Sequence, residues 1–126
     1  MTSKKKLIII FLIFFSIACK NVDLTQPIDA EILTKEYQEK KNRSDRRYRY
    51  NQIIVKGEIN QTFKNNTENL IIVIGNADDI YAISCSMKKD EIILIDPLVQ
   101  GEIVTIQGFC TGISGHIILE DCIFVK

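Results

Sequence analysis

The segment that decides the fold is GEIVTIQGFCTG, which spans residues 101–112. Its apolar and small residues alternate with the others, a pattern that predicts a half-buried strand. Two glycines then favour a hairpin loop over residues 111–116, and a last strand is expected from Ile117 to about Val125. The chain should therefore end in an antiparallel hairpin. The inner face of its first strand would comprise Val104, Ile106, Gly108 and Cys110.

Three upstream segments also have the pattern of strands. Alternating apolar residues predict a strand over residues 52–59, and an unbroken apolar run predicts another over residues 70–74. Alternation over residues 81–87 predicts a third strand. Residues 60–69 are polar and are expected to form a turn, whereas residues 90–98 should cross irregularly or as a short helix. With the C-terminal hairpin, the chain thus holds five predicted strands.

A single helix is expected before the strands, over residues 30–47. Asp29 is suited to cap its first turn, and Ile28 and Leu33 have the spacing of a hydrophobic staple. No proline or glycine interrupts this segment. Apolar and small residues recur every three or four positions, as on one face of an amphipathic helix. That face comprises Ala30, Leu33, Tyr37, Ser44 and Tyr48.

One helix followed by five strands predicts a mainly β domain. Five strands of this length can close into a Greek-key barrel, the OB-fold, and closure removes the exposed edges that a small open sheet would carry. A chain of 126 residues has room for one such domain. We therefore expect a five-stranded OB-fold barrel, preceded by one amphipathic N-terminal helix, over residues 29–126.

The N-terminus has the layout of an export signal. Lys4, Lys5 and Lys6 precede an unbroken apolar run, and small residues follow that run. This order predicts a signal peptide over residues 1–18. The run of about 13 apolar residues is shorter than the roughly 17–25 that span a bilayer, so a permanent transmembrane anchor is the weaker interpretation.

The expected cleavage site, Ser16-Ile17-Ala18-Cys19, resembles the lipobox of bacterial lipoproteins. In that case Cys19 would carry diacylglycerol, and residues 19–28 would form a lipidated tether to a membrane. Ordinary signal cleavage before Cys19 is the alternative, because Ser16 and Ala18 are both small. Lys20 stands where an inner-membrane lipoprotein would carry an aspartate, which favours the outer membrane, on its periplasmic side or its surface.

Charge is unevenly distributed along the chain. Once residues 1–18 are removed, 13 basic and 16 acidic residues remain, which argues against polyanion binding driven by net charge. Residues 35–49 nevertheless hold seven lysines and arginines. This stretch is either a solvated helix face, which we favour, or a polyanion contact for nucleic acid or lipopolysaccharide. The candidate contact residues are Arg43, Arg46, Arg47 and Arg49.

Three cysteines remain when Cys19 is set aside, so at most one internal disulfide can form. Cys110 and Cys122 would lie about 17 Å apart in the predicted hairpin, whereas a disulfide needs Cα atoms within about 7 Å. The third and fifth strands of an OB barrel are neighbours, which makes Cys85–Cys122 the easier pair. Three interpretations stay open: a Cys85–Cys122 disulfide, another pair, or reduced cysteines packed in the core.

The sequence offers little for catalysis or metal binding. The one histidine, His116, lies in the predicted hairpin loop, and neither a Ser-His-Asp arrangement nor a phosphate-binding glycine loop is present. No cysteine pair has the C-x-x-C spacing of a zinc site. We therefore expect no catalytic residue, no metal and no cofactor. The predicted second and third strands carry no outward aromatic residue, so a base-stacking surface is missing and nucleic acid is not expected as a partner.

Short motifs in the helix and the strands are typical of one group of proteins. They are Leu33-x-x-Glu36-Tyr37, Asp45-x-x-Tyr48, Ile54-x-x-Gly57-x-Ile59, Ile83-x-Cys85, Gly101-x-x-Val104-x-Ile106-x-Gly108-x-Cys110-x-Gly112 and Leu119-x-x-Cys122-Ile123. The chain resembles the tRNA_anti-like family of small exported bacterial OB-fold proteins, from about Ala30 to Phe124. Tyr50 and Asn51 stand where the family pattern has Gly and Lys. The resemblance implies the fold and export, but it says little about function.

These features together predict an envelope lipoprotein whose OB-fold domain is a non-enzymatic binding or accessory module. It would reach the membrane through Cys19, and its partner would be an envelope protein or a glycan. The alternative is a polyanion-binding OB-fold protein that uses the basic helix.

Overall fold

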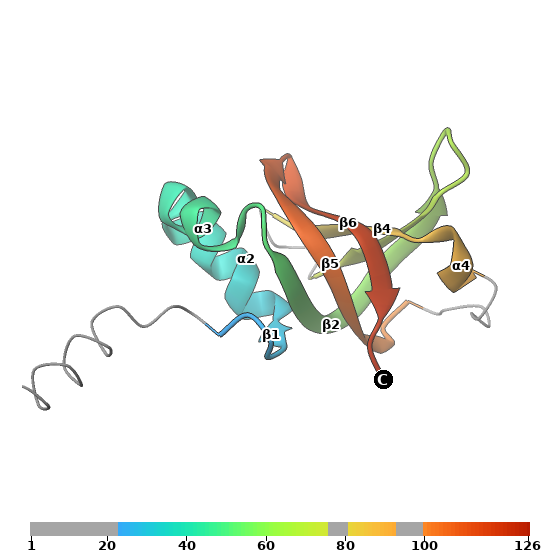
Figure 1. Cartoon of the computed structure of the whole chain (residues 1–126), viewed down its shortest axis with the longest axis horizontal. Coiled ribbons are helices and arrows are strands. Elements are labelled where there is room, and N and C mark those ends of the chain that lie inside the picture. The colour runs from blue at the N-terminus through green and yellow to red at the C-terminus, as the bar shows by residue number, and fades with distance from the viewer. Residues whose placement is uncertain (1–22, 76–80, 93–99) are drawn as a thin grey trace, which may run out of the picture.

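The computed structural model describes residues 23–75, 81–92 and 100–126 (Figure 1). The predicted signal peptide and Cys19 lie outside these residues. Two helices precede most of the strands, and a third, short helix lies between two strands of the barrel. The elements are β1 (Ile28–Asp29), α2 (Ala30–Glu39), α3 (Lys41–Tyr48), β2 (Gln52–Lys64), β3 (Leu70–Ile74), β4 (Ile83–Met87), α4 (Lys89–Ile92), β5 (Ile103–Ser114) and β6 (His116–Phe124).

Five of the strands close into a barrel, which confirms the predicted OB-fold. Their order around the ring is β2, β3, β4, β6 and β5, and β5 pairs back onto β2. Neighbouring strands are antiparallel except β4 and β6, which are parallel. β1 lies outside the ring and runs parallel to β2. Each ring strand thus has a partner on both sides, as closure requires.

The first strand of the barrel is longer than its sequence pattern indicates. β2 runs to Lys64, whereas a strand over residues 52–59 and a turn over residues 60–69 were expected. The pairing with β3 shifts between Ile59 and Gln61, at a β-bulge. A bulge interrupts the two-residue period, so the polar residues that follow it no longer have the pattern of a strand.

The C-terminal hairpin is tighter than predicted. β5 continues through Ser114 and β6 begins at His116, so the loop expected over residues 111–116 is wrong. Gly112 has a φ of 104° and lies at a second register shift inside the hairpin. Its left-handed backbone therefore serves a bulge within the strand and not a loop. The bulge and the short turn set Cys110 opposite Leu119.

The predicted inward faces of the strands fill the barrel. Gly57 also faces inward, and a Cβ there would lie 2.6 Å from both Ala30 Cβ and Ile74 Cγ2. This missing side chain lets the start of α2 pack directly against β2. The fully buried aliphatic and cysteine side chains of the strands include Ile53, Val55, Ile72, Ile74, Ile83, Cys85, Ile106, Cys110, Ile117, Leu119 and Cys122.

The N-terminus of α2 is capped as predicted. The Asp29 carboxylate accepts a hydrogen bond from the backbone N–H of Glu31 over 2.9 Å. Ile28 pairs with Val55 of β2 and packs against the core cluster, and Leu24 packs against the same cluster. The chain is therefore fixed to the barrel from Leu24 onward.

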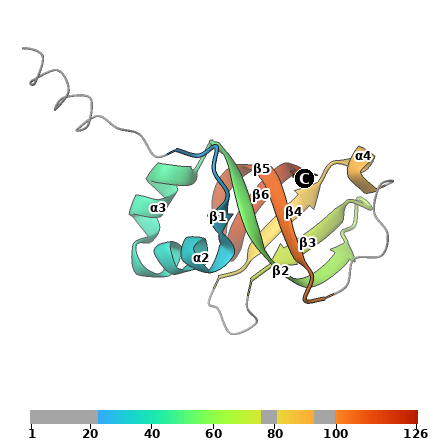
Figure 2. The ribbon, with the colours of Figure 1, turned by 90° about the horizontal axis from the view of Figure 1, so that it is seen from below.

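The predicted single helix over residues 30–47 is wrong, because the segment breaks at Lys40. Lys40 leaves the helical conformation, with φ −144° and ψ 71°, and α3 folds back beside α2 (Figures 1 and 2). In one straight helix Tyr37 and Tyr48 would lie about 16 Å apart along the axis. Their ring centroids are instead 6.3 Å apart. The break thus brings both tyrosines to one end of the barrel, and all five residues of the predicted apolar face are buried.

Candidate functional site

Two reciprocal hydrogen bonds join α2 to α3. The Tyr37 hydroxyl of α2 donates to Asp45 Oδ1 of α3 over 3.0 Å. The Tyr48 hydroxyl of α3 donates to Glu36 Oε2 of α2 over 2.6 Å. We call these four residues the helix latch. Each helix supplies one tyrosine and one carboxylate, so separating the helices would break both bonds.

The environment of the helix latch keeps its phenols protonated. Burial, together with Cys110 and the Asp45 carboxylate, raises the pKa of Tyr37. Burial, followed by the hydrogen bond to Glu36, raises the pKa of Tyr48 to about 12. Both hydroxyls are therefore hydrogen-bond donors at neutral pH, and the two carboxylates are occupied as their acceptors.

The helix latch rests on β5. The Tyr37 hydroxyl lies 4.0 Å from Cys110 Sγ. A Cβ added at Gly112 would lie 3.2 Å from the Arg49 side chain, so the strand approaches the end of α3 closely. Burial raises the pKa of the Cys110 thiol, which makes it a weak nucleophile. The helical motifs of the sequence and the Cys110-x-Gly112 motif therefore specify how the two helices dock on the barrel.

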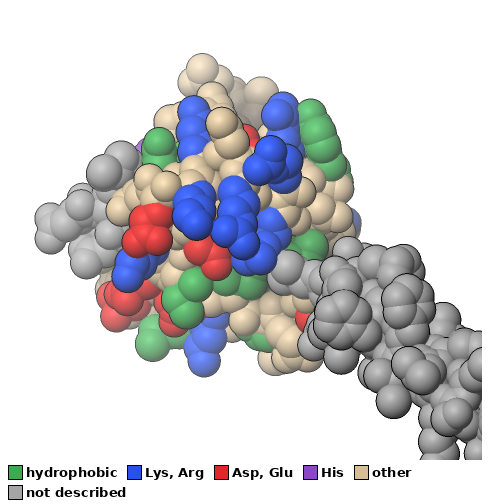
Figure 3. Space-filling view, turned by 90° about the vertical axis from the view of Figure 1, so that its left-hand side faces the viewer, with side chains coloured by type: hydrophobic (Ala, Val, Ile, Leu, Met, Phe, Trp, Pro, Cys, Tyr) green, Lys and Arg blue, Asp and Glu red, His purple; other side chains and the backbone are tan. Residues whose placement is uncertain are grey.

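The basic residues of the same two helices point toward solvent. All seven are exposed, whereas the carboxylates of Glu36 and Asp45 face the tyrosines. Figure 3 shows lysine and arginine side chains gathered on this end of the molecule. The structure thus brings together the four arginines that the sequence singled out. We call the group the basic surface, and it comprises Lys35, Lys40, Lys41, Arg43, Arg46, Arg47 and Arg49.

The two arginines at the end of the basic surface stack on tyrosines. The Arg47 guanidinium lies 5.9 Å from the centroid of the Tyr48 ring, and its Nη1 lies 3.9 Å from Glu36 Oε2. The Arg49 guanidinium lies 4.7 Å from the centroid of Tyr50, whose side chain is 65% exposed. Arg47 therefore supports the helix latch as well as the surface, whereas Lys41, Arg43 and Arg46 contribute to the surface alone.

The charge of the chain separates by position. Residues 35–49 hold seven basic and three acidic residues, whereas residues 50–126 hold five basic and ten acidic residues. The helical end is therefore positive and the barrel sequence is negative. A net charge near zero conceals this polarity, which is why composition alone argued against a polyanion partner.

A hollow of about 240 Å³ lies between α2 and α3 within the basic surface. It is open to solvent, and its lining is polar and mostly charged. Three of the lining residues are basic and two are acidic, so the hollow suits a polar group better than an apolar one. The lining residues are Glu36, Glu39, Lys40, Arg43, Ser44 and Arg47.

The side of β3 and β4 that faces away from the barrel interior holds two buried residues, Ile71 and Val73, and two half-buried serines, Ser84 and Ser86. Its centre consists of small or aliphatic residues, so the expected absence of stacking residues on these two strands holds there. Phe63, at the far end of β2, is 46% exposed and pairs with Ile71 at the rim. Phe63 lies among polar residues that predict a turn, so its sequence pattern does not mark it as part of a strand. We call this group the outer sheet face, and it comprises Gln61, Phe63, Ile71, Val73, Ser84 and Ser86.

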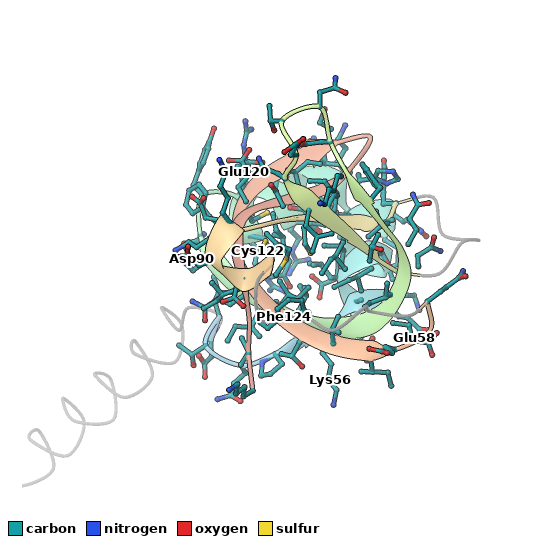
Figure 4. The ribbon with its side chains drawn as sticks, turned by 90° about the vertical axis from the view of Figure 1, so that its right-hand side faces the viewer. Lys56, Glu58, Asp90, Glu120, Cys122 and Phe124 are labelled. Carbon is teal, nitrogen blue, oxygen red and sulfur yellow. The ribbon has the colours of Figure 1, made fainter. Side chains whose placement is uncertain are left out.

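Cys85 and Cys122 meet inside the barrel. Both are fully buried, on parallel strands whose register shifts between Cys85 and Met87. The hydrogen bond between the two thiols, and then burial, raise the pKa of Cys85 well above its ordinary value. Cys122 lies inside the ring in Figure 4, while Lys56 and Glu58 point outward. The predicted pair is thus adjacent and present as free thiols, and its oxidation stays a prediction.

His116 has a structural partner. Its Nδ1 accepts a hydrogen bond from the backbone N–H of Ala82 over 3.2 Å, which ties the start of β6 to the entry of β4. In residues 23–75, 81–92 and 100–126, no three histidine, cysteine or acidic residues gather as metal ligands. None of the helices in these ranges is long and apolar enough to cross a membrane.

Comparisons with solved structures agree with the fold. A protein of Klebsiella pneumoniae subsp. pneumoniae, named a "putative nucleic acid-binding lipoprotein", superposes with a TM-score of 0.65 at 15% identity, over 80% of this chain and 92% of that one. A "putative aspartyl-tRNA synthetase" of Leishmania major superposes with a TM-score of 0.51 at 12% identity, over 85% of this chain and 23% of that one. Likeness at these identities establishes the fold alone. No curated protein matches the chain.

The family is established at the level of sequence. The family model described as tRNA_anti-like matches residues 1–123. The motifs that resemble this family are the residues that build the helix latch, its seat on β5 and the barrel core. This chain belongs to the tRNA_anti-like family.

Proposed function

We propose that this protein is a lipid-anchored, non-enzymatic binding module of the bacterial cell envelope that holds a phosphate-rich polyanion on its basic surface. The separation of charge on α2 and α3 carries the proposal. Carboxylates at Glu36 and Asp45 are bonded to buried tyrosines, and seven exposed bases face outward. The OB-fold barrel is the scaffold that presents these helices.

The chemistry of the basic surface suits phosphate. Arginine binds phosphate oxygens through two parallel N–H donors, and lysine adds a mobile point charge. Arg43 and Arg46 are exposed, and neither belongs to the helix latch. The acidic excess of residues 50–126 would repel the same ligand, so binding should be confined to the helical end.

The N-terminal sequence supports an envelope location. The segment Ser16-Ile17-Ala18-Cys19 has the order expected where a signal peptidase cleaves before a lipidated cysteine. Two or three acyl chains would hold the domain firmly on a membrane. The Klebsiella protein of the same fold is named a "putative nucleic acid-binding lipoprotein". That name combines a lipid anchor with polyanion binding, the two properties proposed here.

A binding experiment with matched charge reversals tests the polyanion. The full-length protein, kept in nonionic detergent, is titrated with lipopolysaccharide and separately with a single-stranded oligonucleotide. The triple variant Lys41→Glu, Arg43→Glu, Arg46→Glu should weaken binding at low salt by about tenfold or more. The control Lys64→Glu, Lys88→Glu, Lys89→Glu changes the same charge on the barrel and should bind normally. Equal losses in both variants, or no binding by the parent protein at low salt, would contradict the proposal.

An intact mass tests the anchor. The mature protein is purified from membranes of its native host and weighed before and after reduction. Acyl chains on a polypeptide that begins at Cys19 are expected, whereas the bare polypeptide would exclude a lipoprotein. A gain of about 2 Da on reduction would show one internal disulfide, and no gain would show that the barrel cysteines are thiols.

The outer sheet face favours a second candidate function, the binding of a glycan or an envelope protein. Phe63 offers one exposed ring, and Ser86 lies on the same side of the sheet two strands away, across Ile71. The corresponding face of OB-folds is a common site for oligosaccharides. The variant Phe63→Ala would weaken such binding without changing the polyanion titration, which separates the two candidates.

A further inference from the structure

We infer that the polyanion held by the basic surface is the layer of anionic lipid headgroups in the very membrane that holds Cys19. This inference rests on the proposed function, and it names the partner of that surface. The chain would lie with α2 and α3 against the membrane and with the far end of the barrel pointing away from it.

The short tether restricts where the membrane can be. Leu24 already packs against the core, and β1 pairs with β2 from Ile28. Cys19 precedes Leu24 by five positions, so the anchor lies within about 17 Å of Leu24 even when the chain is fully extended. In Figures 1 and 2 the described chain begins on the same side of the molecule as α2 and α3. The anchor and the basic surface therefore belong to the same side of the molecule.

Charge then selects the orientation. Residues 35–49 carry seven bases against three acids, and residues 50–126 carry ten acids against five bases. An anionic membrane attracts the basic segment and repels the acidic one. Both the attraction and the repulsion therefore orient α2 and α3 toward the headgroups. The interaction acts over about 8 Å at physiological ionic strength, a distance that the short tether keeps within reach.

The side chains of the basic surface fit an interfacial contact and not an inserted helix. The sequence of α3 is KNRSDRRY, and its one aromatic residue, Tyr48, is buried in the helix latch. Nothing apolar on α3 is thus left to enter the hydrocarbon. Tyr50 follows α3 with its ring exposed beside Arg49. Exposed tyrosine with arginine is typical of proteins at headgroup level.

This orientation leaves the other surfaces free. The turn over residues 65–69 and α4 lie at the opposite end of the molecule from α2 and α3 (Figure 1). These elements would point away from the membrane. A soluble partner in the envelope could therefore reach that end while the basic surface stays on the lipid.

Hydrogen–deuterium exchange of the full-length lipoprotein in vesicles tests the inference. One set of vesicles contains phosphatidylcholine alone, and the other contains phosphatidylglycerol as well. Amides of α3 should exchange about tenfold more slowly in the anionic vesicles, and the difference should vanish at high salt. Amides of residues 65–69 should exchange alike in both. Equal exchange of α3 in the two kinds of vesicle would overturn the inference.

Matched variants and flotation separate the inference from the proposed function. The Lys41→Glu, Arg43→Glu, Arg46→Glu variant should lose the protection of α3, while the Lys64→Glu, Lys88→Glu, Lys89→Glu control should keep it. Flotation with both kinds of vesicle but no protection of α3 would leave the anchor standing and reject the docking. Protection that appears only when an oligonucleotide is added would keep the polyanion and replace the membrane by nucleic acid. Failure to float would reject the anchor and the inference together.

Discussion

Tyr50 combines a strained backbone with an exposed ring. Its φ is 65°, a left-handed conformation that costs most residues about 1–2 kcal/mol. Glycine is the residue that adopts this conformation without strain. We expect Tyr50→Gly to raise the free energy of unfolding by about 0.5–1 kcal/mol. Urea unfolding measures this gain, and membrane docking of the same variant should weaken because the ring beside Arg49 is lost.

Glu68 supplies the control for that prediction. Its φ of 62° is nearly the same, but it lies in the turn after β2, away from the basic surface. Glu68→Gly should therefore stabilise the protein to a similar extent and leave α3 protected on anionic vesicles. If Tyr50→Gly docked as well as the parent protein, the tyrosine would have no part in the contact.

The raised pKa of Tyr48 should make the free energy of unfolding depend on pH in the alkaline range. An unfolded chain has a tyrosine pKa near 10, whereas burial and the bond to Glu36 raise the pKa of Tyr48 to about 12. The folded state holds this proton more tightly, so its contribution to stability is complete below about pH 10 and is lost as pH rises toward 12. Tyr48→Phe should cost about 1–2 kcal/mol at neutral pH and flatten that alkaline decline. Urea titrations across this range test it, with the exposed Tyr50→Phe as control, and an unchanged slope would exclude Tyr48 as its source.

At the scale of elements, the crossing of α2 over β2 depends on Gly57. A Cβ there would approach Ala30 Cβ and Ile74 Cγ2 to 2.6 Å, too close for either to remain in position. Gly57→Ala should therefore destabilise the fold by about 1–3 kcal/mol. Adding Ala30→Gly removes one of the two clashes and should recover part of the loss. Thermal unfolding of the single and double variants measures the coupling, and simple additivity would mean that the helix moves away freely.

The elements also show why some of the fold escapes sequence analysis. The spacing of apolar residues correctly predicted the buried positions of both helices. This is because buried positions require apolar side chains even where the helix is interrupted. No glycine or proline in the sequence marks the break at Lys40. Tertiary hydrogen bonds such as Tyr37–Asp45 stabilise the break instead. The bulge after Ile59 likewise interrupts the alternating pattern, so five residues of β2 have the sequence pattern of a turn. Phe63 is one of these five residues, so the expected absence of aromatic residues on the outer sheet face did not take its exposed ring into account.

At the scale of the whole molecule, the arrangement of charge is the feature that composition conceals. Equal totals of 16 basic and 16 acidic residues describe a chain whose helical end and barrel have opposite signs. The four arginines could be identified from the sequence, but the hydrogen bonds that Glu36 and Asp45 make to tyrosines could not, and Glu39 stays exposed. These hydrogen bonds require the broken helix, because Glu36 and Asp45 reach Tyr48 and Tyr37 only when α3 folds back.

A basic surface kept for binding should weaken the fold that carries it. Arg43 lies three and four positions before Arg46 and Arg47, and like charges at these spacings on a helix repel by about 0.2–0.5 kcal/mol per pair. The variant Arg43→Glu exchanges repulsion for attraction in both pairs and leaves the helix latch intact. We expect it to unfold at low salt with a free energy about 0.5–1 kcal/mol higher than the parent protein, and to lose this advantage at high salt. Urea unfolding at the two salt concentrations decides the matter. A less stable variant would mean that the bases hold the fold together, and the charge separation would then need no ligand to explain it.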